Sequence, residues 1–357
     1  MVISGKEKLL GIQYLRAIAA LMVATYHIPA QVPGYGAMLN HAWIDAGQLR
    51  AGVDIFFVIS GFIMMTTGRE LSGNAFLRRR IARIVPLYWF MTLLLVVIAL
   101  LVPSLLRSTN VTLGATLGSL FFIPYHGTAQ VHFLSPLLAP GWTLNIEMYF
   151  YVIFALTLAA RRYQLAICGL WFACGSLAFG FLIPHLSIAG FYTQPRVLEF
   201  WLGMALGAWH ANHRARVAPA IAAVLAAAAY AILLRNPLQL STDGLIASGF
   251  PAMIIVACVV EIERRGALPE VPILGLLGDA SYSIYLTHMF TLGVLRTLWV
   301  HLPALERLGD IAFMLIAITA LSVAGVGAYQ WIERPLTRLA RHFLTGSAER
   351  GAPVAVA

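Results

Sequence analysis

The chain has 357 residues, of which 60% are hydrophobic and 11% are charged, and its mean hydropathy is +0.81. Because soluble domains carry about 25% charged residues, this composition excludes a soluble globular protein and indicates a polytopic membrane protein. The net charge of +9 comes from basic residues in short segments between apolar stretches. That distribution favours a membrane topology signal over nucleic-acid binding. The three cysteines lie in apolar stretches, and their spacing indicates neither a disulfide framework nor a metal site.

The apolar stretches predict ten membrane-spanning helices, so the expected fold class is all-α. Most of them approach the ~17–25 residues that a spanning helix needs. The stretch 111–123 is apolar but too short to cross, and we expect a partial helix there. The ten predicted spans are approximately 11–30, 51–68, 84–103, 143–160, 164–183, 197–211, 217–234, 243–262, 281–300 and 309–331.

Basic residues predict the orientation of these spans. If the N-terminus lies in the cytoplasm, every inner segment carries at least two Lys or Arg, as the positive-inside bias requires. We therefore predict that both termini are cytoplasmic. The first apolar segment follows Lys6 and Lys8 without a convincing cleavage site, so it is expected to be a retained span. A single transmembrane domain should cover residues 1–341, followed by a short polar tail at 342–357 that we expect to be disordered.

The first predicted span carries two ionisable residues, Arg16 and His27. An ionisable side chain at bilayer depth costs roughly 2.5–3.5 kcal/mol, so it usually marks a functional site or pathway. An offset of eleven residues leaves the two side chains ~20° apart around a helix and ~16 Å apart along its axis. One helix face would therefore offer a cation at one end and an imidazole at the other.

Other ionisable residues should lie near the outer ends of predicted spans. They are Asp54, Glu147, Arg196 and Glu199. An imidazole beside a carboxylate is the arrangement that activates a hydroxyl, and either Asp54 or Glu147 is a candidate partner for His27. The alternative is structural, because acidic residues also cap helices and pair between them. Arg196 and Glu199 are spaced to pair with each other.

The inner side should present Arg16, a basic loop from Phe76 to Pro86, and the segment SYSIYLTH that ends at His288. Guanidinium groups bind phosphates in a two-point fashion, so the loop is a candidate phosphate site. Its composition is equally typical of the topology signal and of contact with anionic lipids. Tyr282, Tyr285 and His288 share roughly one helix face, where core packing is the alternative.

Six sequence motifs in order resemble the acyltransferase family 3 membrane proteins, over about residues 8–338. The first is an Arg-x10-His pair. The others are GVDxFFxxSGF, Arg-x-x-Arg followed by Pro and Tyr, W-[ST]-L-x-x-E, S-Y-x-x-Y-x-x-H and E-[RK]-P. They are matched here by Arg16 with His27, Gly52 to Phe62, Arg80 and Arg83 with Pro86 and Tyr88, Trp142 to Glu147, Ser281 to His288, and Glu333 to Pro335.

The resemblance implies a membrane-bound O-acyltransferase that takes an acyl group, usually acetyl, from cytoplasmic acyl-CoA. The implied acceptor is a hydroxyl of a surface or lipid-linked polysaccharide, and the implied location is the bacterial inner membrane. His27 would act as catalytic base or acyl relay, with Arg16, Asp54 and Glu147 as the other candidate catalytic residues. No permanently bound cofactor or metal is implied, and no nucleic acid. The implied donor-binding residues are Arg16, Arg78, Arg80, Arg83, Ser281, Tyr282 and Tyr285, and those for the acceptor are Trp142, Arg196 and Glu199.

Two other function classes compete with an acyltransferase. A transporter or flippase for a lipid-linked sugar also places charges in the membrane, but no inverted repeat is evident. A membrane scaffold leaves the shared face of Arg16 and His27 unexplained. Some relatives carry a fused esterase-like domain, and we expect a stand-alone form here. The sequence leaves open the sugar and hydroxyl, the acyl chain, direct transfer against an acyl-enzyme intermediate, and the oligomeric state.

Overall fold

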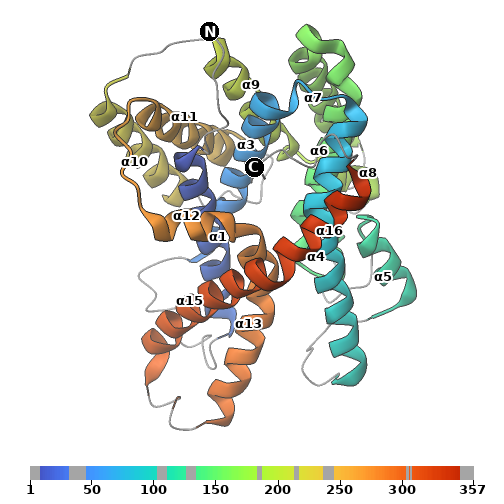
Figure 1. Cartoon of the computed structure of the whole chain (residues 1–357), viewed down its shortest axis with the longest axis vertical. Helices are drawn as coiled ribbons and strands as arrows, with labels where there is room; N and C mark the ends of the chain where they lie inside the picture. The colour runs from blue at the N-terminus through green and yellow to red at the C-terminus, as the bar shows by residue number, and fades with distance from the viewer. Residues whose placement is uncertain are drawn as a thin grey trace. The chain divides into compact units, whose positions relative to one another are not determined.

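A computed structural model of the chain describes residues 9–31, 46–102, 111–125, 134–182, 187–212, 217–235, 245–302, 305 and 308–345. These residues form helices joined by short turns, with no β-strand among them beyond an isolated bridge between Tyr125 and Ser135. The all-α fold class is therefore confirmed (Figure 1). The chain divides into two compact units, which are described separately. The expected single domain over residues 1–341 stays a prediction.

The first unit holds the described residues of Met1–Ile59 and Arg214–Ile332. Helix α1 lies against α11, α12, α13 and α15, and small residues of α1 such as Ala20 and Ala24 join a core with Ile284 and Phe313. The helices of this unit are α1 (Leu10–His27), the start of α3 (Gly52–Ile63), α10 (Pro219–Arg235), α11 (Phe250–Arg264), α12 (Pro272–Asp279), α13 (Ser281–His301) and α15 (Gly309–Ala328). Short 3-10 and π segments add η1 (Pro29–Gln31), η2 (Ala46–Ala51), η6 (Leu245–Gly249) and most of η7 (Tyr329–Glu333).

The N-terminal end of α1 is held by residues of the same unit that lie about 250 positions later in the sequence. Its first N–H groups have no partner within the helix, and no side chain caps them locally. The N–H groups of Leu10 and Gly11 instead donate to the two carboxylate oxygens of Glu263, at 2.6 and 3.0 Å. Tyr14 donates its hydroxyl to the carbonyl of Pro269 at 3.0 Å. These bonds fix where α1 begins, and hence where Arg16 and His27 lie.

Glycines allow the helices of this unit to approach α1 closely. A Cβ atom on Gly52 would lie 2.4 Å from the carbonyl oxygen of Ala19, and one on Gly278 would lie 2.2 Å from that of Gln13. Any larger residue would therefore force the helices apart. Small residues have this role at many contacts between membrane helices.

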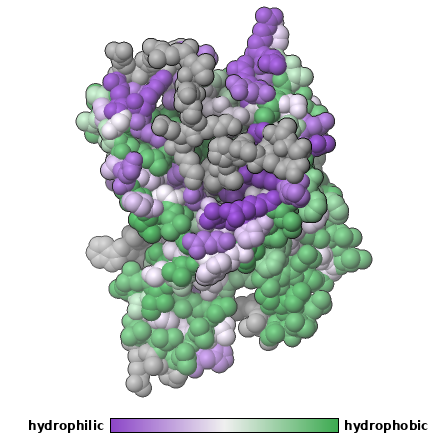
Figure 2. Space-filling model, in the orientation of Figure 1, coloured by the Kyte–Doolittle hydropathy of each residue, from purple (hydrophilic) through white to green (hydrophobic). Residues whose placement is uncertain are grey.

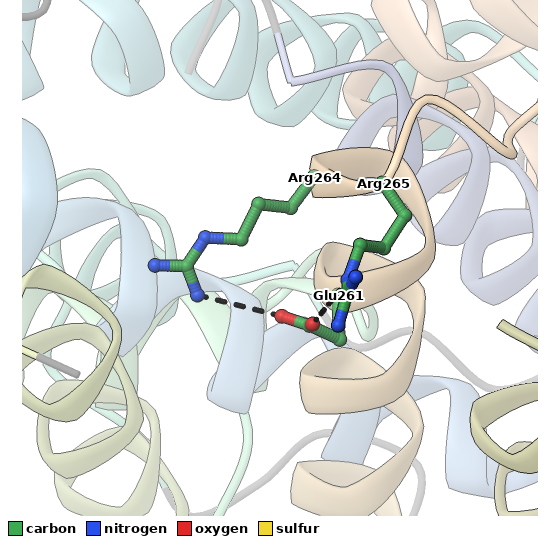
Figure 3. Close-up of polar contacts among 3 residues, drawn as sticks. All are labelled: Glu261, Arg264 and Arg265. Carbon is green, nitrogen blue, oxygen red and sulfur yellow. Dashed lines mark hydrogen bonds and ion pairs between the residues drawn. The ribbon is translucent and has the colours of Figure 1, made fainter. Parts of the chain in front are cut away.

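Figure 3 shows the C-terminal end of α11, where Glu261 lies between two arginines. Its carboxylate accepts from Arg265 Nε at 3.1 Å and from Arg264 Nη1 at 3.4 Å. These arginines are the basic residues of a predicted inner segment. Glu261 offsets part of their charge on the helix itself.

The second unit holds the described residues of Ser60–His213 and Glu333–Gly351. Its longest helix, α4, contacts α5, α6 and α16, and the C-terminal helix α16 crosses it obliquely (Figure 1). The helices of this unit are α4 (Gly73–Leu101), α5 (Leu113–Leu120), α6 (Gly141–Thr157), α7 (Gln164–Leu182), α8 (Ile188–Tyr192), α9 (Val197–Asn212) and α16 (Arg334–Leu344). Two short segments, η3 (Met64–Gly68) and η5 (Leu158–Tyr163), extend α3 and α6.

Two local predictions are wrong. The stretch Phe76–Pro86 is not a loop, because α4 begins at Gly73 and continues through Pro86. Arginine is a good helix former, and the Ser72 side chain caps the helix by accepting from the N–H of Ala75. The expected disordered tail at 342–357 is helical at its start, since α16 continues to Leu344. Residues 346–357 lie outside the described part of the chain.

Apolar helices of membrane-spanning length confirm the membrane class in its coarser form. Among the described residues, four helical stretches are long and apolar enough to cross a bilayer: Gln48–Gly68, Gly73–Leu101, Gly141–Ala178 and Gly309–Leu344. The surface over α4 and α5, at the lower right of Figure 2, is largely hydrophobic. Apolar side chains exposed on α4, such as Trp89, Leu93 and Leu100, fit contact with lipid. The partial helix expected at 111–123 is confirmed as α5.

Candidate active site

The first unit brings two imidazoles together at the C-terminal end of α1. His27 is the last residue of α1 and is half-buried. Its ring stacks on that of His288 from α13, with ring centroids 5.1 Å apart and an interplanar angle of 28°. The Tyr26 ring lies edge-on to His27 at 4.7 Å, and the Arg50 guanidinium lies 5.5 Å from the centroid of Tyr26. His27 is thus surrounded by aromatic and cationic groups.

His288 is fully buried. Its Nδ1 lies 2.6 Å from the carbonyl oxygen of Tyr285, and its Nε2 has no hydrogen-bond partner in the described part of the chain. The Tyr285 ring in turn contacts Phe56 of α3, with centroids 6.1 Å apart. The sequence groups this segment with Arg16, whereas the structure places its last residue beside His27, at the opposite end of α1.

Arg16 is buried within α1. Because α1 is helical without interruption from Leu10 to His27, the expected placement of Arg16 and His27 on one face, ~16 Å apart along the axis, follows from helix geometry. Asp54 is fully buried in the first turn of α3. Across the described residues no hydrogen bond or ion pair joins Asp54 to His27, and neither Asp54 oxygen has a hydrogen-bond partner. Asp54 as the partner of His27 stays a prediction.

Glu147 lies in the second unit, in a group of hydroxyls. Ser60 donates to its Oε1 at 2.9 Å, and Tyr151 donates to the same oxygen. The Arg80 guanidinium lies 6.0 Å from the centroid of the Tyr151 ring and 5.7 Å from that of Phe76. The structure therefore groups Glu147 with a predicted donor-binding arginine.

Besides Arg16 on α1, the predicted donor-binding arginines lie on the first turns of α4 and differ in surroundings. Arg78 is exposed, whereas Arg80 and Arg83 are half-buried. Arg83 forms an ion pair with the fully buried Glu333, just before α16. The half-buried Arg341 of α16 lies close enough to Arg79, Arg80 and Arg83 to be repelled by their positive charges. Guanidinium groups gathered in this way form a basic surface suited to a polyanion.

The predicted acceptor-binding residues come together in part. The Arg196 guanidinium lies 5.8 Å from the centroid of the Trp142 ring, so α6 and the turn before α9 meet at this contact. Glu199 is fully buried in the first turn of α9. Ser281 is fully buried at the start of α13, and Tyr282 is half-buried beside it. Nothing in these contacts tests the binding roles predicted for them.

Sequence reasoning missed three participants. The spacing of His288 three residues after Tyr285 predicts that both share one helix face, but it does not single out His288 as a candidate site residue. Tyr151 follows Glu147 by four residues, which also predicts contact on a helix. Ser60 is the Ser of the GVDxFFxxSGF motif, but no sequence spacing predicts its contact with Glu147, which lies 87 residues away. No group of three metal-ligating side chains lies together among the described residues.

Comparisons with known proteins cover nearly the whole chain. The sequence profile of the family described as an acyltransferase domain matches residues 9–327. The chain is similar to the exopolysaccharide production protein ExoZ of Rhizobium meliloti (strain 1021), with 36% identity over 324 residues, covering 88% of this chain and 100% of ExoZ. No solved structure matches the chain.

Two further relatives are longer proteins. The putative peptidoglycan O-acetyltransferase YrhL of Bacillus subtilis (strain 168) is 27% identical over 368 residues, covering 91% of this chain and 54% of YrhL. The putative O-acetyltransferase SACOL0978 of Staphylococcus aureus (strain COL) is 25% identical over 371 residues, covering 92% of this chain and 57% of that protein. The chain thus spans about half the length of these two relatives. The family match over most of the chain, with full coverage of ExoZ, shows that this protein belongs to acyltransferase family 3 and is an acyltransferase.

Proposed function

We propose that this protein is a membrane O-acyltransferase that moves an acyl group, most simply acetyl, from cytoplasmic acyl-CoA to a hydroxyl of a surface or lipid-linked polysaccharide. The acceptor class follows the similarity to an exopolysaccharide production protein, and O-acetylation follows the names of the longer relatives. His27 acts in this reaction either as the base for the acceptor hydroxyl or as the carrier of the acyl group.

The observation that carries this proposal is the imidazole of His27, half-buried at the end of α1 and stacked on a second imidazole. A neutral imidazole has one nitrogen with a free lone pair. That atom can take a proton from a hydroxyl or attack a thioester carbonyl. His27 makes no ion pair with a carboxylate in the described part of the chain, so its lone pair stays available for substrate.

The basic surface of α4 and α16 supports the donor class. Coenzyme A carries several phosphate groups, and arginine binds phosphate through paired N–H donors. Arg80 and Arg341 bring two guanidinium groups to one surface, and their mutual repulsion is relieved when a polyanion binds between them. Arg16, buried in α1, would line the path that the donor takes toward His27.

The proposed topology is ten spans with both termini in the cytoplasm of a bacterial cell, in its cytoplasmic membrane. The apolar helices of the described chain and the basic inner segments support it. In this orientation α1 enters from the cytoplasm, so Arg16 faces the donor side and His27 faces the acceptor side. The donor and acceptor would then meet at the His27 end of α1.

The test compares the surface polysaccharides of cells that have the protein, lack it, or produce His27→Ala. Mass analysis should find an acetyl-sized increment on the polysaccharide only in cells with the wild-type chain. The His27→Ala chain should reach the membrane in normal amount, as an immunoblot of the membrane fraction would show. Equal acetylation in cells with His27→Ala would reject His27. Loss of the polysaccharide from the surface, with unchanged acetylation of what remains, would favour a transporter.

A further inference from the structure

The buried imidazole of His288 has a defined protonation pattern. A backbone carbonyl only accepts hydrogen bonds, so Nδ1 must carry the proton in its 2.6 Å contact with the oxygen of Tyr285. In the neutral ring the lone pair is then on Nε2. The Tyr285 carbonyl thereby fixes both the ring orientation and the tautomer, as the partner of a working histidine does in many enzymes.

The Nε2 lone pair of His288 is unused within the described chain. The residue is fully buried, and Nε2 has no hydrogen-bond partner. Leaving a buried acceptor unpaired is destabilising. The neighbouring residues of α13 that face the core, Ile284 and Leu292, are apolar, and an apolar residue at position 288 would avoid this cost. The unused lone pair is therefore explained best by a hydrogen-bond donor on a molecule that binds transiently, such as a substrate.

The stacked rings place His288 beside His27. The two rings stack with centroids 5.1 Å apart, so a group hydrogen-bonded to Nε2 of His288 is within reach of whatever His27 holds. In the described chain no hydrogen bond joins the two rings, which leaves each with its own lone pair. With two adjacent imidazoles, one ring can carry the acyl group while the other accepts the proton.

We infer that His288 Nε2 takes the proton from the acceptor hydroxyl while His27 carries the acyl group, an assignment that rests on the proposed function. In the first step a His27 nitrogen attacks the thioester carbonyl, the C–N bond forms and the C–S bond breaks. The thiolate leaves with the proton of the other His27 nitrogen. His27 then holds a neutral acyl-imidazole, and its ring has no base to offer beside the acyl carbon.

In the second step the sugar oxygen attacks the acyl carbon, the C–O bond forms and the C–N bond breaks. The hydroxyl proton passes to His288 Nε2, where the Tyr285 carbonyl stabilises the imidazolium through Nδ1–H. His288 then returns that proton to the departing His27 ring. The products are the ester and free CoA thiol, and both histidines regain their starting states.

The test separates the two half-reactions in membrane vesicles that contain the full chain. The first half is exchange of radiolabelled CoA into unlabelled acetyl-CoA without any acceptor. The second is transfer of radiolabelled acetyl groups to polysaccharide purified from cells that lack the protein. His288→Asn keeps a donor near the position of Nδ1, and His288→Gln keeps an oxygen acceptor near Nε2 without a basic nitrogen. His301→Asn is the matched control, since His301 on the same helix also bonds a backbone carbonyl but is exposed.

We expect both His288 variants to retain exchange within a few-fold and to lose transfer by about 100-fold or more, as loss of a general base does. His301→Asn should match the wild type in both assays. The inference is overturned if wild-type vesicles transfer acetyl without exchange, if His288→Asn transfers normally, if it loses both half-reactions, or if His288→Gln restores transfer. Absence of transfer by the wild type itself would instead count against the proposed function.

Discussion

Arg80 and Arg83 lie one helical turn apart on α4 and meet different neighbours. Arg83 forms an ion pair with the buried carboxylate of Glu333, whereas Arg80 lies over the rings of Phe76 and Tyr151. A motif of two arginines predicts one shared role in phosphate binding. The structure gives Arg83 a structural bond, and the donor roles of both arginines stay predictions.

Substitution of Arg83 should therefore affect stability. In Arg83→Ala the buried Glu333 loses its guanidinium partner, which we expect to destabilise the protein by about 3–5 kcal/mol. The double variant Arg83→Ala with Glu333→Gln should recover part of this loss, because it removes the buried charge. Thermal unfolding of the protein in detergent measures both. A double variant as unstable as the sum of the two single variants would show that the pair is not coupled.

Substitution of Arg80 should affect the donor. Arg80→Ala is expected to raise KM for acetyl-CoA by at least about 10-fold, because one hydrogen bond to a charged group contributes roughly 1.5 kcal/mol or more. Arg338→Ala on α16 is the control, since Arg338 is exposed. Equal changes in KM for both variants would assign the effect to general surface charge.

At the same scale, the contacts of Glu147 show what sequence can and cannot predict about the site. The motif identifies the residue itself, and Tyr151 is predictable from the helical spacing of four. Its partner Ser60 belongs to another helix, and no local pattern predicts which hydroxyl meets which carboxylate. The stack of His27 on His288 is similar, because the contact of two residues so far apart in sequence depends on how α1 packs on α13.

Helix α1 is held along its length by neighbours that approach its backbone. Gly278 of α12 touches the carbonyl of Gln13 so closely that a Cβ atom has no room, whereas a Cβ atom on Gly275 of the same helix would meet nothing within 4 Å. The two glycines therefore differ in what they face. The α1–α12 contact sets the position of the helix that carries Arg16 and His27.

Gly278→Ala should separate α1 from α12 and destabilise the protein by about 1–3 kcal/mol, the usual cost of overpacking. Gly275→Ala should be neutral or slightly stabilising, because alanine favours a helix over glycine. Unfolding temperatures in detergent, measured alongside acetyl transfer, compare the two. If Gly275→Ala is as harmful as Gly278→Ala, the close contact between Gly278 and α1 would not be the cause of the destabilisation.

Helix α4 shows why hydropathy locates an apolar segment better than the ends of the helix that contains it. Hydropathy detects the apolar part of α4, and the predicted span from residue 84 ends close to Leu101. The first turns carry four arginines and therefore resemble a loop in a hydropathy profile. Backbone hydrogen bonding does not depend on hydropathy, so the helix continues to its Ser72 cap. The same reason applies to α16. Its arginines give it a polar profile, so the sequence does not predict that the helix continues to Leu344.

Each of the two compact units is built from separate stretches of sequence, so the chain passes from one unit to the other more than once. The predicted catalytic residues Arg16, His27 and Asp54 belong to the first unit, and Glu147 belongs to the second with Arg78, Arg80 and Arg83. The six motifs in their family order predict that their residues belong to one functional site. It carries no information on which motifs share a compact unit, because that depends on long-range packing.

The proposed topology can be tested by labelling single cysteines in a chain whose three native cysteines are replaced by serine or alanine. Ala30, just after α1, and Glu70, between η3 and α4, are both exposed. A membrane-impermeant maleimide added to intact cells should label Ala30→Cys and leave Glu70→Cys unlabelled. Permeabilised cells should label both. The reverse pattern in intact cells would invert the orientation, and labelling of both would contradict the number of spans between them.

The carboxylate that caps α1 has a consequence for the order of assembly. Glu263 lies 253 positions after Leu10, so at a synthesis rate of ~5–20 residues per second the ribosome needs about 13–50 s to reach it. Until then the leading N–H groups of α1 lack this cap, and by its end the segment Ser60–His213 of the second unit has been synthesised. The helix that bears His27 is therefore among the first to be inserted and among the last to be fixed in place.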